Sequence, residues 1–105
     1  MPQFTVYKNR DARTKATFPL LVDVQSDLLA DLQTRVVVPL TDTPALLKKP
    51  LSKLTPIVEI DGDEYLLMTP ELAGIGRKEL GTPVSSLAEQ RGVIVGALDF
   101  LITGI

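Results

Sequence analysis

The sequence predicts one small mainly-β domain, an antiparallel barrel or sandwich, followed by a C-terminal helix. Three observations predict it. Short apolar runs alternate with turn-forming residues along most of the chain, as in small all-β folds. The dipeptide Asp61-Gly62 separates two of these runs and is a strong signal of a two-residue hairpin turn. The last part of the chain changes to helical spacing, and a length of 105 residues suits a single domain.

Five segments have the composition of strands. In the first, Phe4 and Val6 lie on one face, and the second and third are apolar and β-branched, which is typical of central strands. Pro39 in the third segment predicts that this strand ends there or lies at a sheet edge, because proline has no N–H to donate. The expected strands are residues 3–8, 20–24, 35–40, 57–60 and 64–68.

Two local patterns in the middle of the chain have simple structural explanations. Thr43 before Pro44 is typical of an N-cap followed by proline at the first helical position, so residues 45–49 are expected to form a helical turn. Asp61, Asp63 and Glu64 could suggest a metal site. The chemistry of a hairpin turn explains these carboxylates better, and no metal or cofactor is expected.

The C-terminal segment is expected to be a helix. Ser86 and Glu89 form a capping box, which predicts a helix over residues 87–102. Its apolar residues cover much of its circumference, so we expect it to be buried on more than one side. Gly92 and Gly96 leave a shallow groove on this helix. The groove packs either on the protein's own barrel or on a second copy of the chain, and the sequence favours neither.

Composition argues against several classes of function. The net charge of −2 and the pI near 5.0 argue against direct nucleic-acid binding by the chain alone, which needs a basic face. The sequence has no Cys and no His, so it lacks thiolate chemistry and an imidazole base. We therefore expect no enzymatic activity. A small hydrolase that uses a carboxylate and a hydroxyl is a remote alternative.

The tail of the chain is unusually apolar. Residues 93–105 hold one charged side chain, Asp99, yet the apolar stretch is shorter than the roughly 20 residues that cross a bilayer. Leaving such side chains in water is unfavourable by about 25 cal/mol per Å². We expect the tail to be buried in its own core, in a second copy or in another protein. The N-terminus shows no signal peptide, so the cytoplasm is the expected compartment and no membrane contact is expected.

Four stretches of the sequence carry a more specific signal. They are Gln3-Phe4-Thr5-Val6-Tyr7, Val22-Asp23-Val24-Gln25-Ser26-Asp27-Leu28-Leu29, Val38-Pro39-Leu40 and Gly104-Ile105. In this order they resemble the CcdB family, the toxins of type II toxin–antitoxin modules, from residue 3 to residue 105. The resemblance implies an SH3-like antiparallel β-barrel with a C-terminal α-helix, assembled as a symmetric homodimer. It also implies a function, because such toxins bind the DNA gyrase A subunit and trap the cleaved gyrase–DNA complex.

The resemblance further implies which residues bind the partners. Gyrase is held by the end of the C-terminal helix and by an apolar pair after Gln-Ser-Asp. The acidic tail of a CcdA-like antitoxin finds its contacts on basic loops and on the neighbouring hairpin. The implied gyrase-binding residues are Leu28, Leu29, Asp99, Ile102, Thr103, Gly104 and Ile105. The implied antitoxin-binding residues are Arg10, Arg13, Lys15, Lys48, Lys49, Tyr65 and Glu71.

The tail departs from the family pattern. The best-known family tail has tryptophan where this chain has Thr103, and asparagine and phenylalanine where it has Asp99 and Ile102. Loss of a large aromatic side chain from an interface centre costs about 2 kcal/mol or more. An alternative function is therefore an antitoxin-binding co-repressor module of the same fold, with lost or altered gyrase targeting. Leu28 and Leu29 also have a structural alternative, as core residues that anchor their loop.

Overall fold

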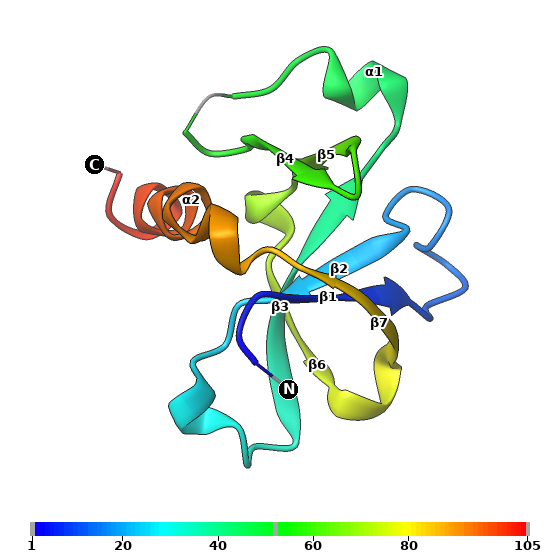
Figure 1. The fold of residues 1–105 in the computed structure, drawn as a ribbon, viewed down its shortest axis with the longest axis vertical. Helices are drawn as coiled ribbons and strands as arrows, with labels where there is room; N and C mark the ends of the chain where they lie inside the picture. The colour runs from blue at the N-terminus through cyan, green and yellow to red at the C-terminus, as the bar shows by residue number, and fades with distance from the viewer. Residues whose placement is uncertain (1, 52, 105) are drawn as a thin grey trace.

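The protein is a curled antiparallel sheet that carries a helix on one side (Figure 1). The computed structural model describes residues 2–51 and 53–104. In these ranges one sheet contains seven strands: β1 (Thr5–Asn9), β2 (Leu20–Asp23), β3 (Thr34–Thr41), β4 (Ile57–Ile60), β5 (Asp63–Leu67), β6 (Ala73–Gly76) and β7 (Leu80–Ser86). The spatial order is β4-β5-β3-β2-β1-β7, and β6 also pairs with β3. This half-barrel with its C-terminal helix confirms the predicted mainly-β fold class.

The helical segments are short apart from the last one. Those in the described part of the chain are α1 (Pro44–Leu47), α2 (Arg91–Thr103) and the 3-10 turns η1 (Asp27–Leu29), η2 (Thr69–Glu71), η3 (Arg77–Glu79) and η4 (Ala88–Gln90). α1 confirms the predicted helical turn. Thr43 is its N-cap residue and Pro44 its first residue, as predicted. The Thr43 hydroxyl caps no backbone N–H and accepts a hydrogen bond from the Thr41 hydroxyl at 3.0 Å. None of the helices that the structure describes is long and apolar enough to cross a membrane.

β3 lies in the interior of the sheet, and this corrects the expectation for Pro39. The strand continues to Thr41, and Pro39 pairs with Leu21 of β2. On its other side β3 pairs with β6 through residues 34–37 and with β5 through its last two residues. Pro39 falls between these two partners, where its carbonyl oxygen accepts the Met68 N–H at 2.9 Å. The missing proline N–H therefore lies where neither strand of the ladder requires it.

Local backbone chemistry sets the ends of two strands. Asp61 and Gly62 have φ values of 52° and 88°, so they form the predicted two-residue turn between β4 and β5. Phe4 also has a positive φ, 70°, and only 3% of its side chain is exposed. The chain bends at this residue, which explains why β1 begins at Thr5 and not at Gln3 as predicted.

The core lies between the sheet and α2. Leu87 and Ile94 are completely buried, in one cluster with apolar side chains from β1 to β5. The strand residues of this cluster are Val6, Leu20, Val22, Val38, Leu40, Val58, Ile60 and Leu67. α2 begins at Arg91, later than predicted, and the expected capping box does not form. Ser86 is still paired in β7, and its hydroxyl accepts the Ala88 N–H at 3.2 Å in the turn that precedes the helix.

Candidate protein-binding surfaces

η1 presents two leucines to solvent on a loop fixed by polar contacts. The side chains of Leu28 and Leu29 are 94% and 50% exposed. The Ser26 hydroxyl accepts the Leu28 N–H at 3.2 Å, and the Gln25 side-chain amide donates to the Leu29 carbonyl at 2.8 Å. Asp27 accepts a backbone N–H from the N-terminal segment at 2.7 Å. The alternative in which both leucines anchor the loop in the core is therefore wrong.

The last turn of α2 exposes a third apolar side chain. Ile102 is 78% exposed, and Asp99 one turn earlier is exposed as well. The Thr103 hydroxyl donates to the Asp99 carbonyl at 2.7 Å. Gly104 ends the helix with a φ of 72°, and its N–H donates to the Phe100 carbonyl at 2.9 Å. The predicted contact residue Ile105 lies outside the described residues.

The outward face of α2 carries a stripe of small residues. Gly92 and Gly96 are exposed, and a Cβ built on either would meet no atom within 4 Å. The alternative in which their groove packs on the protein's own barrel is therefore wrong. Val93 is 45% exposed and Leu101 is 39% exposed. The prediction that the helix is buried on more than one side is thus wrong for the single chain.

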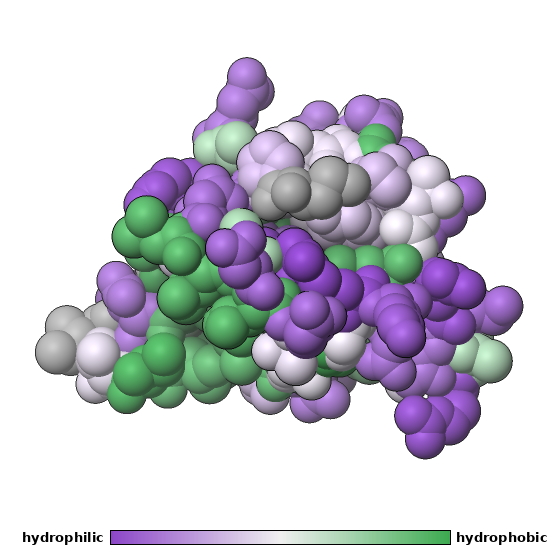
Figure 2. All heavy atoms as spheres, turned by 90° about the horizontal axis from the view of Figure 1, so that it is seen from below, coloured by the Kyte–Doolittle hydropathy of each residue, from purple (hydrophilic) through white to green (hydrophobic). Residues whose placement is uncertain are grey.

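α2 and η1 lie on the same side of the molecule (Figure 1). Figure 2 shows that hydrophobic side chains gather on this side, whereas hydrophilic side chains dominate the other. The exposed apolar residues of these two elements, here called the apolar surface, are Leu28, Leu29, Val93, Leu101 and Ile102. Exposed apolar side chains that gather in this way typically mark a site of protein interaction.

The loop between β1 and β2 carries three of the predicted antitoxin contacts, on the opposite side of the molecule (Figure 1). Arg10, Arg13 and Lys15 are all exposed. Arg13 Nε lies 3.3 Å from Asp11 Oδ1, and the hydrogen bond from Arg13 lowers the pKa of the Asp11 carboxyl. The ionised carboxylate offsets part of the positive charge of this loop.

Two further basic residues directly follow α1. Lys48 and Lys49 are exposed and directly follow α1, which contacts β5, the strand that carries Tyr65. Burial raises the pKa of the Tyr65 phenol, and nearby aspartates, Asp42 first among them, raise it further. These three predicted antitoxin contacts thus belong to β5 and to the segment after α1, two neighbouring parts of the fold, and aspartates surround the Tyr65 phenol.

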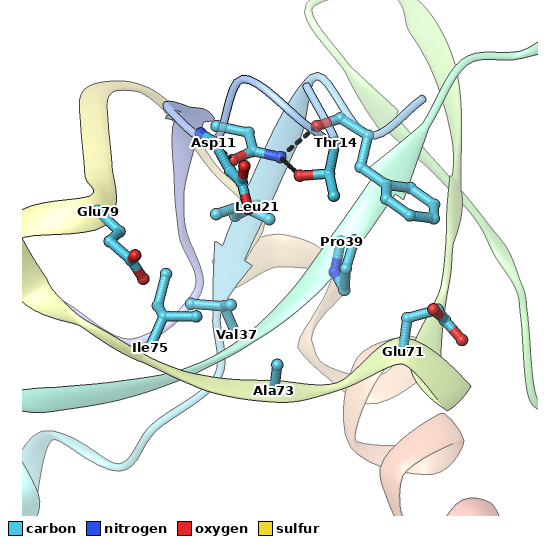
Figure 3. Close-up of a pocket in the computed structure, with 11 residues that line it drawn as sticks. Asp11, Thr14, Leu21, Val37, Pro39, Glu71, Ala73, Ile75 and Glu79 are labelled. Carbon is cyan, nitrogen blue, oxygen red and sulfur yellow. Dashed lines mark hydrogen bonds between the residues drawn. The ribbon is translucent and has the colours of Figure 1, made fainter. Parts of the chain in front are cut away.

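The last predicted antitoxin contact, Glu71, lines a cavity of about 200 Å³ that the sequence did not predict (Figure 3). Asp11 and Glu79 contribute two more carboxylates. Its apolar walls come from β2, β3 and β6: Leu21, Val37, Pro39, Ala73 and Ile75. The Asn9 side-chain amide donates to the Thr14 hydroxyl and to a carbonyl of the same loop, both at 2.9 Å. These bonds hold the β1–β2 loop over the cavity, so Glu71 and that loop belong to one surface.

The fold and these surfaces define a small mainly-β protein, a curled half-barrel with one apolar and one charged side. A sequence model described as CcdB protein matches residues 3–104, which span the sheet and α2. The chain therefore belongs to the CcdB family and is a toxin of a toxin–antitoxin module. The match confirms the resemblance seen in the sequence. Among the residues that the structure describes, no group of three or more Asp or Glu side chains could hold a metal ion.

Proposed function

We propose that the protein binds the A subunit of DNA gyrase through the apolar surface and traps the cleaved gyrase–DNA complex. The observation that carries this proposal is the exposure of Leu28 and Ile102, which are 94% and 78% exposed on one side of the molecule. Covering apolar area gains about 25 cal/mol per Å², so these side chains are natural anchors for a partner. Leu29, Asp99, Thr103, Gly104 and Ile105 complete the proposed gyrase contact.

In this proposal the toxin acts by binding, and gyrase itself performs the DNA chemistry. A ligand that binds one state of its target more tightly than another shifts the population toward the first state. A toxin that contacts only the cleaved complex well therefore needs no catalytic group of its own. The polar contacts that hold η1 and the glycine that ends α2 support this role, because an ordered surface loses little entropy on binding.

A symmetric homodimer is the proposed active form. Gly92 and Gly96 expose backbone on the outward face of α2, so a second chain can approach this helix closely. Val93 flanks the stripe and is 45% exposed, so in the proposed dimer it belongs to the contact between copies and not to the gyrase contact. A two-fold dimer would present two copies of the apolar surface, an arrangement that suits a dimeric target.

A CcdA-like antitoxin is the proposed inhibitor, bound on the opposite side. Its acidic tail would meet Arg10, Arg13, Lys15, Lys48 and Lys49, with Tyr65 and Glu71 beside them. All five basic side chains are exposed, and charge complementarity speeds the encounter of such partners. Because Asp11 and Glu71 carry the same charge as an acidic tail, the apolar walls of the cavity in Figure 3 would supply the closer contacts.

A DNA cleavage assay tests the gyrase contact. The purified protein is mixed with gyrase, ATP and supercoiled plasmid, and detergent and protease then release any broken DNA. We expect linear DNA with the wild type and none with Ile102→Asp, because a carboxylate in the contact would lose its hydration. Val84→Asp is the matched control. Val84 is 38% exposed on β7, an element that contributes nothing to the apolar surface, so this variant should cleave like the wild type.

Two results would contradict parts of the proposal. Equal amounts of linear DNA from the wild type and from Ile102→Asp would exclude this side chain as a gyrase anchor. No linear DNA from a well-folded wild type would favour the alternative function, an antitoxin-binding co-repressor module of the same fold. The Thr103 and Asp99 substitutions in the family's tail pattern are the observation that keeps this alternative open.

A further inference from the structure

Two arginines from different elements meet at one carbonyl oxygen, that of the residue that directly follows η1. Arg35, on β3, donates from Nη1 to the Ala30 carbonyl at 3.5 Å, and Arg77, in η3, donates from Nη2 to the same oxygen at 2.6 Å. The Arg35 side chain is 2% exposed, whereas Arg77 is exposed. The buried Arg35 guanidinium and the solvent-exposed Arg77 guanidinium thus lie on the same carbonyl oxygen.

Only one of these two guanidinium groups has a carboxylate partner in the described part of the chain. Arg35 Nε donates to Asp23 Oδ2 at 2.8 Å, and Arg35 Nη2 lies 2.6 Å from the same oxygen. That Nη2 makes no hydrogen bond of good geometry, although it is buried. Arg77 has no carboxylate partner within ion-pair distance in the described part of the chain. Within ion-pair distance, the described residues therefore supply one carboxylate for two guanidinium groups.

An open cleft of about 290 Å³ gives access to these groups. Tyr7, Arg35 and Arg77 line it together with Leu80 and Gly81. Only 3% of Tyr7 is exposed, so its phenol belongs to the floor of the cleft and not to its rim. The cleft thus combines a buried arginine and a buried phenol with one solvent-accessible arginine, over a partly apolar lining.

We propose that this cleft is an oxyanion-binding site that takes a carboxylate or phosphoryl group on Arg77, above the floor formed by Arg35 and Tyr7. Guanidinium groups present several N–H donors in a fixed plane, which matches the oxygens of both ligand classes. A bound anion would give the Arg77 guanidinium a negatively charged partner. The site shares no residue with the proposed gyrase and antitoxin contacts. A negative result for this site would therefore leave the proposed function unaffected, and the reverse also holds.

An NMR titration of backbone amides tests the site. The wild type is titrated with sodium phosphate and, separately, with sodium acetate, while sodium chloride keeps the ionic strength constant. We expect saturable shifts centred on Tyr7, Arg77, Leu80 and Gly81. Arg77→Gln should weaken the binding at least tenfold. Lys78→Gln, which removes the same charge from the next exposed residue, is the matched control and should change the affinity less than twofold.

The results of the titration distinguish between the possible ligands. Saturation with phosphate alone identifies a phosphoryl ligand, saturation with acetate alone identifies a carboxylate ligand, and both together support a general oxyanion site. Shifts that never saturate, or that chloride reproduces at equal ionic strength, would overturn the proposal. So would equal losses of affinity in Arg77→Gln and Lys78→Gln, because they would reduce the effect to general charge attraction.

Discussion

At the scale of single residues, the ion pair of Asp23 and Arg35 is the polar centre of the sheet. Both side chains are buried, at 0% and 2% exposure, and the guanidinium lies 2.6 Å from the carboxylate. Asp23 also accepts the Gln25 N–H at 3.0 Å. This explains why a charged residue occurs in an otherwise apolar strand. Arg35 on the neighbouring strand β3 neutralises the charge of Asp23. The other carboxylate oxygen of Asp23 accepts the Gln25 N–H and so fixes the start of the next loop.

Replacing Asp23 should therefore destabilise the fold strongly. Asp23→Asn leaves the Arg35 guanidinium buried without a counter-charge, and breaking such a pair typically costs about 3–5 kcal/mol. We expect a loss of this size in the free energy of unfolding measured by urea denaturation. The exposed Asp31 gives the control, since Asp31→Asn should change stability by less than about 0.5 kcal/mol. A loss in Asp23→Asn as small as that of the control would contradict the role of the pair.

The two tyrosines predict how stability changes at high pH. Burial raises the pKa of both phenols above the ordinary value of 10.0, and Asp23 raises that of Tyr7 while Asp42 raises that of Tyr65. A raised pKa means that the folded state holds its phenol proton more tightly than the unfolded state does. The stabilisation is therefore complete below pH 10 and is lost as pH rises through the folded pKa values.

Phenolate absorbance measures this directly. In the folded protein both transitions should lie at higher pH than in urea, and the free energy of unfolding should decrease above about pH 10. Tyr7→Phe should remove part of that decrease. Folded and urea-unfolded protein titrating at the same pH would show that the phenols are not desolvated.

At the scale of elements, the close approach of β1 and β7 depends on Gly81. A Cβ at this position would lie 2.6 Å from the Lys8 carbonyl oxygen and 3.1 Å from Arg10 Cγ. Gly81→Ala should therefore push the strands apart and lower the free energy of unfolding by about 1–3 kcal/mol, measured by urea denaturation. Gly74→Ala is the control on β6, where the added methyl meets no atom within 4 Å. Similar stability of both variants would contradict this packing argument.

Strands, turns and helix ends were predictable from the sequence where a few adjacent residues determine them. The β4–β5 hairpin depends on positive φ at Asp61 and Gly62, which two adjacent residues reveal. β6 and β7 both escaped prediction. β6 has only one half-buried apolar residue, and β7 contains a proline and mostly exposed residues, so only pairing with β3 and β1 reveals them as strands. The start of α2 was misplaced for a similar reason. Pairing with β1 keeps Ser86 in β7, which overrides its local capping signal.

The candidate surfaces also combine residues that the sequence identifies with features that only the three-dimensional structure shows. Sequence motifs singled out Leu28 and Ile102, but only the three-dimensional structure reveals that these side chains face solvent and not the core. Helical spacing predicts that Val93 and Leu101 are buried with the rest of the helix, because such spacing does not say which apolar positions the sheet covers. The cavity beside Glu71 and the Arg77 cleft could not be predicted, since each is assembled from distant strands and loops.

At the scale of the whole molecule, the single chain exposes more surface than its mass requires. Its accessible surface is 6327 Å² for 11.4 kDa. A typical monomer of this mass exposes roughly 5,800 Å². The excess agrees with an open half-barrel whose helix carries apolar side chains outward. Covering the outward face of α2 with a second copy would bring the molecule closer to the ordinary ratio.

The glycine stripe of α2 allows this arrangement to be tested without disturbing the chain itself. In a free monomer Gly96→Leu should be tolerated, because the position opens to solvent and leucine is a better helix former than glycine. In a dimer packed on this stripe, the same side chain would hold the two chains apart. We expect sedimentation equilibrium to show a dimer dissociation constant at least tenfold higher than that of the wild type. This corresponds to a loss of about 1.4 kcal/mol in the free energy of dimerisation.

The control for this experiment is Thr17→Leu, which adds the same side chain at an exposed position of the β1–β2 loop. It should leave the dimer unchanged, and both variants should keep the helix content of the wild type. A monomeric wild type, or equal dissociation constants for Gly96→Leu and Thr17→Leu, would mean that the stripe is not a contact between copies. The exposed backbone of Gly92 and Gly96 would then be left for the target or the antitoxin to cover.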